Sequence, residues 1–126
     1  MRPILLAAAM MAPAAAVGQT TPPANAAPPQ VAVHVSVKTP AGAPRALVEA
    51  GMVQSAPIYA KVPGLIRKYF TIGQADLGGI YLFKDRPAAQ AWFSAAWRDK
   101  ATATYGSQPV VTYFDVPLVV DNGGGK

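Results

Sequence analysis

The stretch Gly78-Gly79-Ile80-Tyr81-Leu82-Phe83-Lys84-Asp85 decides the fold, because it predicts a strand that runs directly into a helix. Its paired glycines let a neighbouring backbone or a ligand approach closely, and residues 80–83 are apolar on both faces of a pleat. Asp85 is placed to cap the following helix, with Pro87 in the first turn, where a missing N–H is tolerated. We therefore expect this strand to be covered on both sides.

A strand and a helix are predicted ahead of this stretch. The valines at alternate positions of residues 30–38 predict a strand with one strongly apolar face, and His34 lies on the other face. Apolar residues at helical spacing predict a helix over residues 43–54. Ser55 is predicted to be the N-cap of a short second helical segment that continues through Lys61.

A hairpin, a second helix and a last strand complete the pattern. On the strand that precedes the hairpin turn, Lys68 is expected to share a face with Phe70, and Leu65 to share the other face with Tyr69. The helix has a wide apolar face that includes both tryptophans. The predicted bounds are 65–71 for the strand, 73–76 for the turn, 86–99 for the helix and 109–115 for the last strand.

This order of elements predicts an α+β fold of the ferredoxin-like βαββαβ type, with a four-stranded antiparallel sheet and two helices on one face. The other face of the sheet is left open. Because the strands carry apolar residues on both sides, we expect a second copy to cover the open face, which gives a homodimer of two packed sheets.

The segments outside the fold predict export. A charged start, a short apolar run and small residues indicate a signal peptide over 1–18, cleaved after Gly18 or, as second choice, after Ala16. The apolar run is too short to span a bilayer, so no stable membrane insertion is expected after cleavage, and the location would be periplasmic or secreted. The remaining divisions are a Pro/Ala-rich disordered tether over 19–29, the folded domain over 30–121 and a flexible tail over 122–126.

Composition narrows the function classes. The chain of 126 residues has 52% hydrophobic and 13% charged residues, which is apolar for a monomer. Its net charge of +5 comes from scattered basic residues, so no nucleic-acid partner is expected. With no cysteine, thiolate catalysis and disulfides are excluded. One histidine and six scattered carboxylates show no ligand spacing, so we predict no metal site. Gly78-Gly79 opens a strand where a dinucleotide-binding fingerprint would open a helix, so we predict no nucleotide cofactor either.

Five stretches of the sequence form a pattern that is found in a known family: 62–69, 78–83, Ala91-Trp92, Trp97-Arg98 and 113–117. Together they resemble the YdhR-like monooxygenases of the dimeric α/β-barrel superfamily, which also includes antibiotic-biosynthesis monooxygenases. The resemblance covers about residues 30–121 and implies a homodimer that inserts oxygen into an electron-rich ring without metal or flavin. Some members of that superfamily degrade haem, but His34 lies on a predicted strand and does not resemble their helix-borne ligand.

The candidate site residues follow from this chemistry. His34 would be the base that deprotonates a phenol or quinol, because its ordinary pKa lies near neutrality. Tyr81 and Tyr69 would orient a substrate oxygen, and Trp92 and Trp97 would stack on its ring. The alternative for the histidine is a hydrogen bond at the dimer interface, and for the aromatic residues it is core packing.

Two arginines, Arg98 and Arg67, are candidates to steady an anionic intermediate. The alternative for Arg98 is that it only complements the helix end. The resulting hypothesis is an exported, cofactor-independent monooxygenase acting on a small aromatic or quinol-type molecule. The alternative is a non-catalytic dimeric module of the same fold that binds a small hydrophobic or aromatic ligand, or none.

Overall fold

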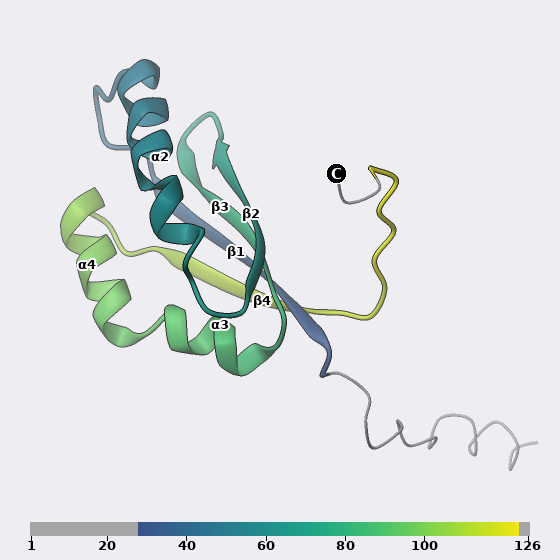
Figure 1. Cartoon of the computed structure of the whole chain (residues 1–126). Coiled ribbons are helices and arrows are strands. Elements are labelled where there is room, and N and C mark those ends of the chain that lie inside the picture. The colour runs from purple at the N-terminus through teal and green to yellow at the C-terminus, as the bar shows by residue number, and fades with distance from the viewer. Residues whose placement is uncertain (1–27, 124–126) are drawn as a thin grey trace, which may run out of the picture.

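The computed structural model describes residues 28–123, which form an antiparallel sheet with helices on one of its faces (Figure 1). The predictions of a signal peptide over 1–18, of most of the tether over 19–29 and of most of the tail over 122–126 lie outside the described residues. Within residues 28–123, no helix is long and apolar enough to cross a membrane. The elements are β1 (Gln30–Lys38), α2 (Arg45–Tyr59), β2 (Leu65–Ile72), β3 (Asp76–Phe83), α3 (Arg86–Trp92), α4 (Ala95–Tyr105) and β4 (Val110–Val116).

The sheet has the strand order β2-β3-β1-β4, and every neighbouring pair is antiparallel. Two pairs of strands connect through helices, β1 with β2 and β3 with β4. Each strand lies next to strands of the other pair, as a ferredoxin-like fold requires. The helices all lie on one face, and the chain after β4 runs past the other face (Figure 1). The predicted fold class is therefore confirmed.

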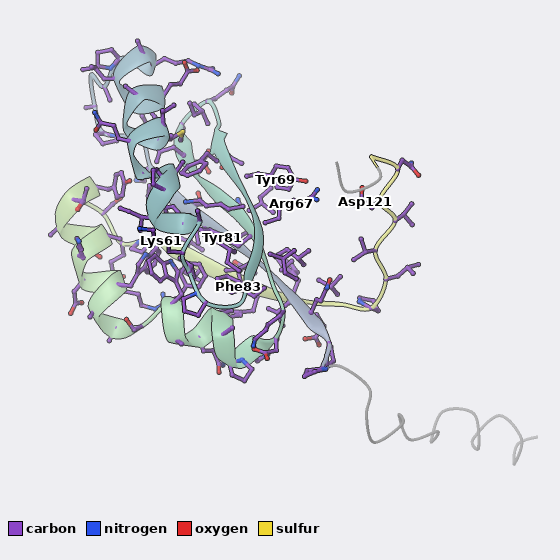
Figure 2. All side chains as sticks on the ribbon, in the orientation of Figure 1. Lys61, Arg67, Tyr69, Tyr81, Phe83 and Asp121 are labelled. Carbon is purple, nitrogen blue, oxygen red and sulfur yellow. The ribbon has the colours of Figure 1, made fainter. Side chains whose placement is uncertain are left out.

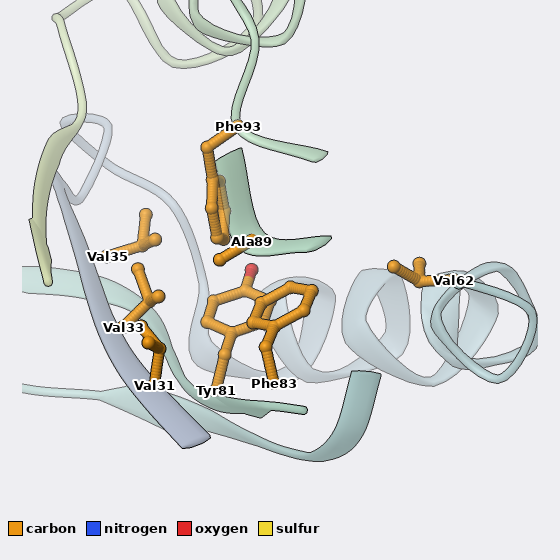
Figure 3. Packing of buried hydrophobic residues seen from close by; sticks show 8 residues of the cluster. All are labelled: Val31, Val33, Val35, Val62, Tyr81, Phe83, Ala89 and Phe93. Atoms are coloured by element: carbon orange, nitrogen blue, oxygen red, sulfur yellow. The ribbon is translucent and has the colours of Figure 1, made fainter. Parts of the chain in front are cut away.

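The core lies between β1, β3 and α3. Side chains alternate across a strand, so the odd-numbered valines of β1 and the odd-numbered aromatic residues of β3 point to the helices together. Val33 and Phe83 have no exposed surface. Figure 3 shows Tyr81 and Phe83 side by side beneath Phe93 and Ala89, with the valines of β1 along one flank.

The cap of α3 is confirmed. The Asp85 carboxylate accepts from the backbone N–H of Ala88 at 2.9 Å, and a proline occupies the first turn. The prediction of one helix over 86–99 is wrong, because the segment is divided between α3 and α4. Phe93 leaves the helical conformation, and the hydroxyl of Ser94 accepts from the N–H of Trp97 at 3.2 Å as the cap of α4. The break lets Phe93 enter the core.

The first helix also differs from the prediction. Ser55 does not cap a new turn; its hydroxyl donates to the carbonyl of Met52 at 2.9 Å, and α2 continues without a break to Tyr59 with Pro57 inside it. A back-bonded serine is a known way for this residue type to remain inside a helix. Tyr59 is thereby carried over the sheet at the end of α2.

The pleat of β2 is altered by a β-bulge. The pairing with β3 shifts between Leu65 and Arg67, so Leu65 lies opposite Phe83 and packs on the core. The prediction that Leu65 shares a face with Tyr69 is therefore wrong. Lys68 and Phe70 do share a face, as predicted, and that face is the one covered by the helices, because their partners are Tyr81 and Gly79.

The close approach of β1 to β3 requires glycine at position 78. A Cβ added there would overlap the carbonyl oxygen of Val35. We expect Gly78→Ala to lower the free energy of unfolding by about 2 kcal/mol or more, since the backbone of β1 cannot move without disturbing the core. Urea unfolding followed by tryptophan fluorescence measures the change.

Gly51→Ala is the matched control, because a Cβ at this position in α2 meets nothing within 4 Å. Removing a glycine from a helix interior should stabilise the protein by about 1 kcal/mol. Equal effects of the two substitutions would show that the contact between β1 and β3 at Gly78 is not close.

Candidate functional site

A cavity of about 480 Å³ lies between the sheet and the helices α2 and α4. Its volume falls within the range of roughly 300 to 1,000 Å³ that small-molecule sites occupy. The floor comes from β1, β2 and β3, and α3 closes one end. Its aromatic and charged lining includes Tyr59, Lys68, Phe70, Tyr81, Trp92 and Trp97.

Tyr59 is the centre of an aromatic cluster at this cavity. Its ring centroid lies 5.6 Å from that of Phe70, 6.0 Å from that of Tyr81 and 5.6 Å from that of Trp92. The Phe70 and Trp92 contacts are edge-to-face, the geometry in which the positive edge of one ring meets the negative face of another. A planar ligand would therefore meet fixed aromatic walls.

Lys68 carries a positive charge into this cluster. Its Nζ lies 3.3 Å from the centroid of the Tyr59 ring, 3.9 Å from that of Phe70 and 4.7 Å from that of Tyr81. No carboxylate of residues 28–123 lines the cavity. Among residues 28–123 the ammonium makes no ion pair and no hydrogen bond, so only the ring faces stabilise its charge.

Burial lowers the pKa of Lys68 from its ordinary value to about 7, because an apolar surrounding disfavours the charged form. At neutral pH the amine and the ammonium are thus both populated. Burial raises the pKa of Tyr59 and that of Tyr81, for the same reason applied to an acid, so both phenols keep their protons. The cavity therefore holds a proton acceptor of near-neutral pKa beside two hydroxyl donors.

Trp92 has a buried indole N–H group. Its Nε1 is buried and has no hydrogen-bond partner within residues 28–123. A buried donor without a partner costs about 1 to 3 kcal/mol. Trp92 is also one of the residues that line the cavity.

The residues predicted for the site divide between two faces of the sheet. Tyr81, Trp92 and Trp97 line the cavity. His34 and Tyr69 lie on the opposite face: His34 is exposed between Ile80 and Thr112, and the side chain of Tyr69 points away from Tyr81 (Figure 2). His34 therefore does not share a cavity with the tryptophans in this protomer. Its role as a base is not tested by this placement.

The two arginine candidates also lie outside the cavity. Arg98 is exposed on α4 and is not among the lining residues. Arg67 donates to the Tyr69 hydroxyl at 3.1 Å and lies 3.8 Å from the Asp121 carboxylate, beside the chain that follows β4 (Figure 2). Their proposed roles toward an anion stay predictions.

Sequence reasoning missed Tyr59, Lys68 and Phe70 as site residues. A signal existed for Lys68, because a lysine that alternates with Phe70 on the covered face of a strand must enter the core or a cavity. No comparable signal pointed to Tyr59, which reaches the cavity only because α2 continues through Pro57. No group of three or more metal-ligating side chains occurs within residues 28–123.

The comparisons with known proteins find solved structures that are similar to this chain. No family model matches the sequence, and no curated protein matches it. Protein NE2512 of unknown function from Nitrosomonas europaea has a TM-score of 0.59 at 17% identity, covering 75% of this chain and 96% of that chain. SnoaB in a mutant form, a cofactor-independent oxygenase from Streptomyces nogalater, has a TM-score of 0.51 at 22% identity, covering 72% and 96%.

At these identities the similarity shows the fold alone. The heme-degrading protein Rv3592 from Mycobacterium tuberculosis is also similar, with a TM-score of 0.48 at 19% identity over 77% of this chain and 100% of that chain. The ferredoxin-like fold is thus shared with an oxygenase and with a protein of unknown function. The assignment to the YdhR-like group stays a prediction.

Lys68 should destabilise the fold in a pH-dependent way. Its pKa is about 7 in the folded state and 10.5 ordinarily. Between these two pH values the folded state therefore binds fewer protons than the unfolded state. The free energy of unfolding consequently rises with pH over this range. We expect Lys68→Met to raise the free energy of unfolding by about 2 kcal/mol at neutral pH and below, less than the full change in pKa would give, because solvent reaches part of the side chain.

The gain should shrink as the pH rises toward 10.5. Denaturant titrations at a series of pH values measure it, with Lys61→Met as the control, because Lys61 is exposed and does not line the cavity. A gain that is the same at every pH would mean that the Lys68 amine is fully hydrated.

Proposed function

We propose that this protein is an exported, cofactor-independent oxygenase that acts on a small aromatic molecule of the quinol or anthrone type. The observation that carries the proposal is Lys68, a lysine with no anionic partner among residues 28–123, set in an aromatic-walled cavity of about 480 Å³. The fold shared with a cofactor-independent oxygenase supports it as fold-level analogy.

The reaction needs a base and a place for an organic anion. A phenol or anthrone becomes able to give an electron to oxygen only after it loses a proton. The neutral Lys68 amine accepts that proton, and the ammonium that forms then stabilises the anion beside it. For an anthrone, one oxygen atom ends as the new ring carbonyl, and the other leaves as water with the two hydrogens of the oxidised carbon.

The other cavity residues have binding roles in this proposal. The phenol of Tyr81, which keeps its proton, donates to the substrate oxygen, and Tyr59 stands next to it. Trp92 and Trp97 provide ring faces for stacking. We prefer Lys68 to His34 as the base, since His34 lies on the other face of the sheet.

The assembly that we propose is a homodimer formed through the open face of the sheet. That face exposes several large apolar side chains, which a monomer rarely leaves uncovered. Tyr69 is 54% exposed, Ile80 44% and Phe114 51%, although each belongs to a regular strand. The cavity lies on the opposite face, so closing the dimer would leave it accessible.

A substitution on the open face tests the dimer. We expect the protein to sediment as a dimer at micromolar concentration, and Ile80→Asp to weaken the dimer by at least about tenfold, because it places a charge in an apolar interface. Val53→Asp is the control, since Val53 is 74% exposed on α2. A wild-type monomer in analytical ultracentrifugation, or an equal effect of both substitutions, contradicts this assembly.

Oxygen consumption tests the reaction. With a panel of quinols and anthrones, we expect uptake whose kcat rises as the pH increases through about 7, when Lys68 loses its proton. Lys68→Met should lower kcat by about a hundredfold, the usual contribution of a positioned base. Lys61→Met should leave it unchanged. An oxygen electrode, with product analysis by mass spectrometry, measures both.

His34→Ala separates the two candidate bases. Full activity in this variant with loss in Lys68→Met supports the cavity lysine, whereas the reverse pattern assigns the base to the open face. Binding of the aromatic compounds without oxygen uptake contradicts the oxygenase and favours the non-catalytic binding module.

A further inference from the structure

The charges that line the cavity are all positive. Lys68 and Lys100 are the basic side chains among its lining residues, and no aspartate or glutamate of residues 28–123 lines it. Lys68 comes from β2 in the sheet and Lys100 from α4 above it. A ligand in the cavity therefore meets cations from both layers of the fold.

The carboxylates of residues 28–123 all lie away from the Lys68 ammonium. Asp76 accepts from the Ser36 hydroxyl at 2.5 Å, and Asp85 caps α3. The other contacts are those of Glu49 with Arg45 at 2.7 Å, Asp115 with Arg86 at 3.1 Å and Asp121 with Arg67 at 3.8 Å. Asp99 is exposed on α4 and does not line the cavity. None of them supplies a counter-ion to Lys68.

The ring faces only partly replace a counter-ion. A cation over an aromatic face gains about 0.5 to 2 kcal/mol, and the ammonium keeps three N–H donors that rings satisfy poorly. An oxyanion would accept a charge-assisted hydrogen bond, which is about twice as strong as a neutral one and is strengthened further by the apolar surroundings. The missing component of this site is therefore an anion.

We propose that the cavity binds an apolar organic monoanion, a carboxylate or phenolate, whose oxygen accepts from the Lys68 ammonium and whose hydrocarbon part lies against α2. The wall that α2 offers is apolar, with Leu47, Met52 and Ile58. The inference names a ligand class for the cavity of the proposed function, and it does not depend on turnover.

Binding should be linked to proton uptake. The titratable groups that face Lys68 are Tyr59 on α2 and Tyr81 on β3, and Lys100 and Tyr105 of α4 complete the lining. Burial raises the pKa of both facing tyrosines, so near neutral pH the titrating group is Lys68. The anion favours the ammonium, so the complex takes up a proton and affinity falls as the pH rises above about 7.

The test uses 2-naphthoate and its neutral analogue 2-naphthalenemethanol, which have the same ring system. Isothermal titration calorimetry at about pH 6 and about pH 9 gives both affinities, and buffers of different ionisation enthalpy give the protons exchanged. We expect the anion to bind at least about tenfold more tightly than the alcohol at the lower pH. We also expect this preference to fall at the higher pH, with uptake of nearly one proton.

Two substitutions of Lys68 keep the proposal falsifiable. Lys68→Met should abolish the preference for the anion, while Lys68→Arg, which stays charged, should keep the preference and abolish the proton uptake. Lys61→Met should behave as the wild type. Circular dichroism verifies folding, and the Arg variant decides the matter if the Met variant does not fold.

Three results would overturn the proposal: equal affinity for naphthoate and the alcohol, a preference that survives Lys68→Met in the folded protein, or anion binding without proton uptake above neutral pH. Naphthoate offers no quinol to oxidise. If naphthoate binds as expected but quinols cause no oxygen uptake, only the oxygenase proposal is refuted. If quinols cause oxygen uptake but naphthoate is not preferred over the alcohol, only the anion site is refuted.

Discussion

The constraint on which the structure depends is the alternation of side chains along β1 and β3. One set of positions, which includes Val33 and Phe83, points to the helices and is excluded from solvent. The other set, which includes His34 and Ile80, is left on the open face. This separation places the cavity on one side of the sheet and the exposed apolar surface on the other, so that ligand binding and assembly can use different faces.

The cavity exists because the helices cover the sheet unevenly. Beside β1 and β3, α3 packs closely, with Ala89 fully buried and the Phe93 ring 5.0 Å from that of Tyr81. At the other end α2 has no buried residue and places Gly51 and Ser55 over the sheet. Small side chains cannot fill the distance between the layers. A packed half thus holds the fold together, and a loosely filled half provides the space for a ligand.

The sequence predicts the fold well because buried side chains recur at a regular spacing along each strand and helix, and this spacing is visible in the sequence. The valines of β1 and the cap at Asp85 are local signals, and both are confirmed. The division of the second helix was not predictable from its apolar spacing, since Phe93 fits a helical stripe equally well. The break is determined by tertiary packing of that ring together with the Ser94 cap, and a serine inside an apolar pattern is a weak signal.

The candidate site was less predictable, because its residues come from elements far apart in the sequence. The aromatic cavity was expected, and Tyr81, Trp92 and Trp97 do line it. The choice of His34 followed from its ordinary pKa, a property of the free side chain. In the folded protein the environment matters more: burial brings the pKa of Lys68 to about 7, near the value that made the histidine attractive.

Lys68 is a basic side chain in an apolar cavity with no counter-ion among residues 28–123, and its charge is therefore a cost to stability. Arg45, Arg67 and Arg86 each lie beside a carboxylate at the surface. Lys68 has the long alkyl chain needed to reach solvent, yet its Nζ lies over the ring of Tyr59. Perturbed ionisable groups of this kind cluster at functional sites, where the structure holds a group in a state that the unfolded chain would not favour. Lys68 has no counter-ion among residues 28–123 and lies in a cavity large enough for a small ligand, and side-chain packing alone does not explain this arrangement.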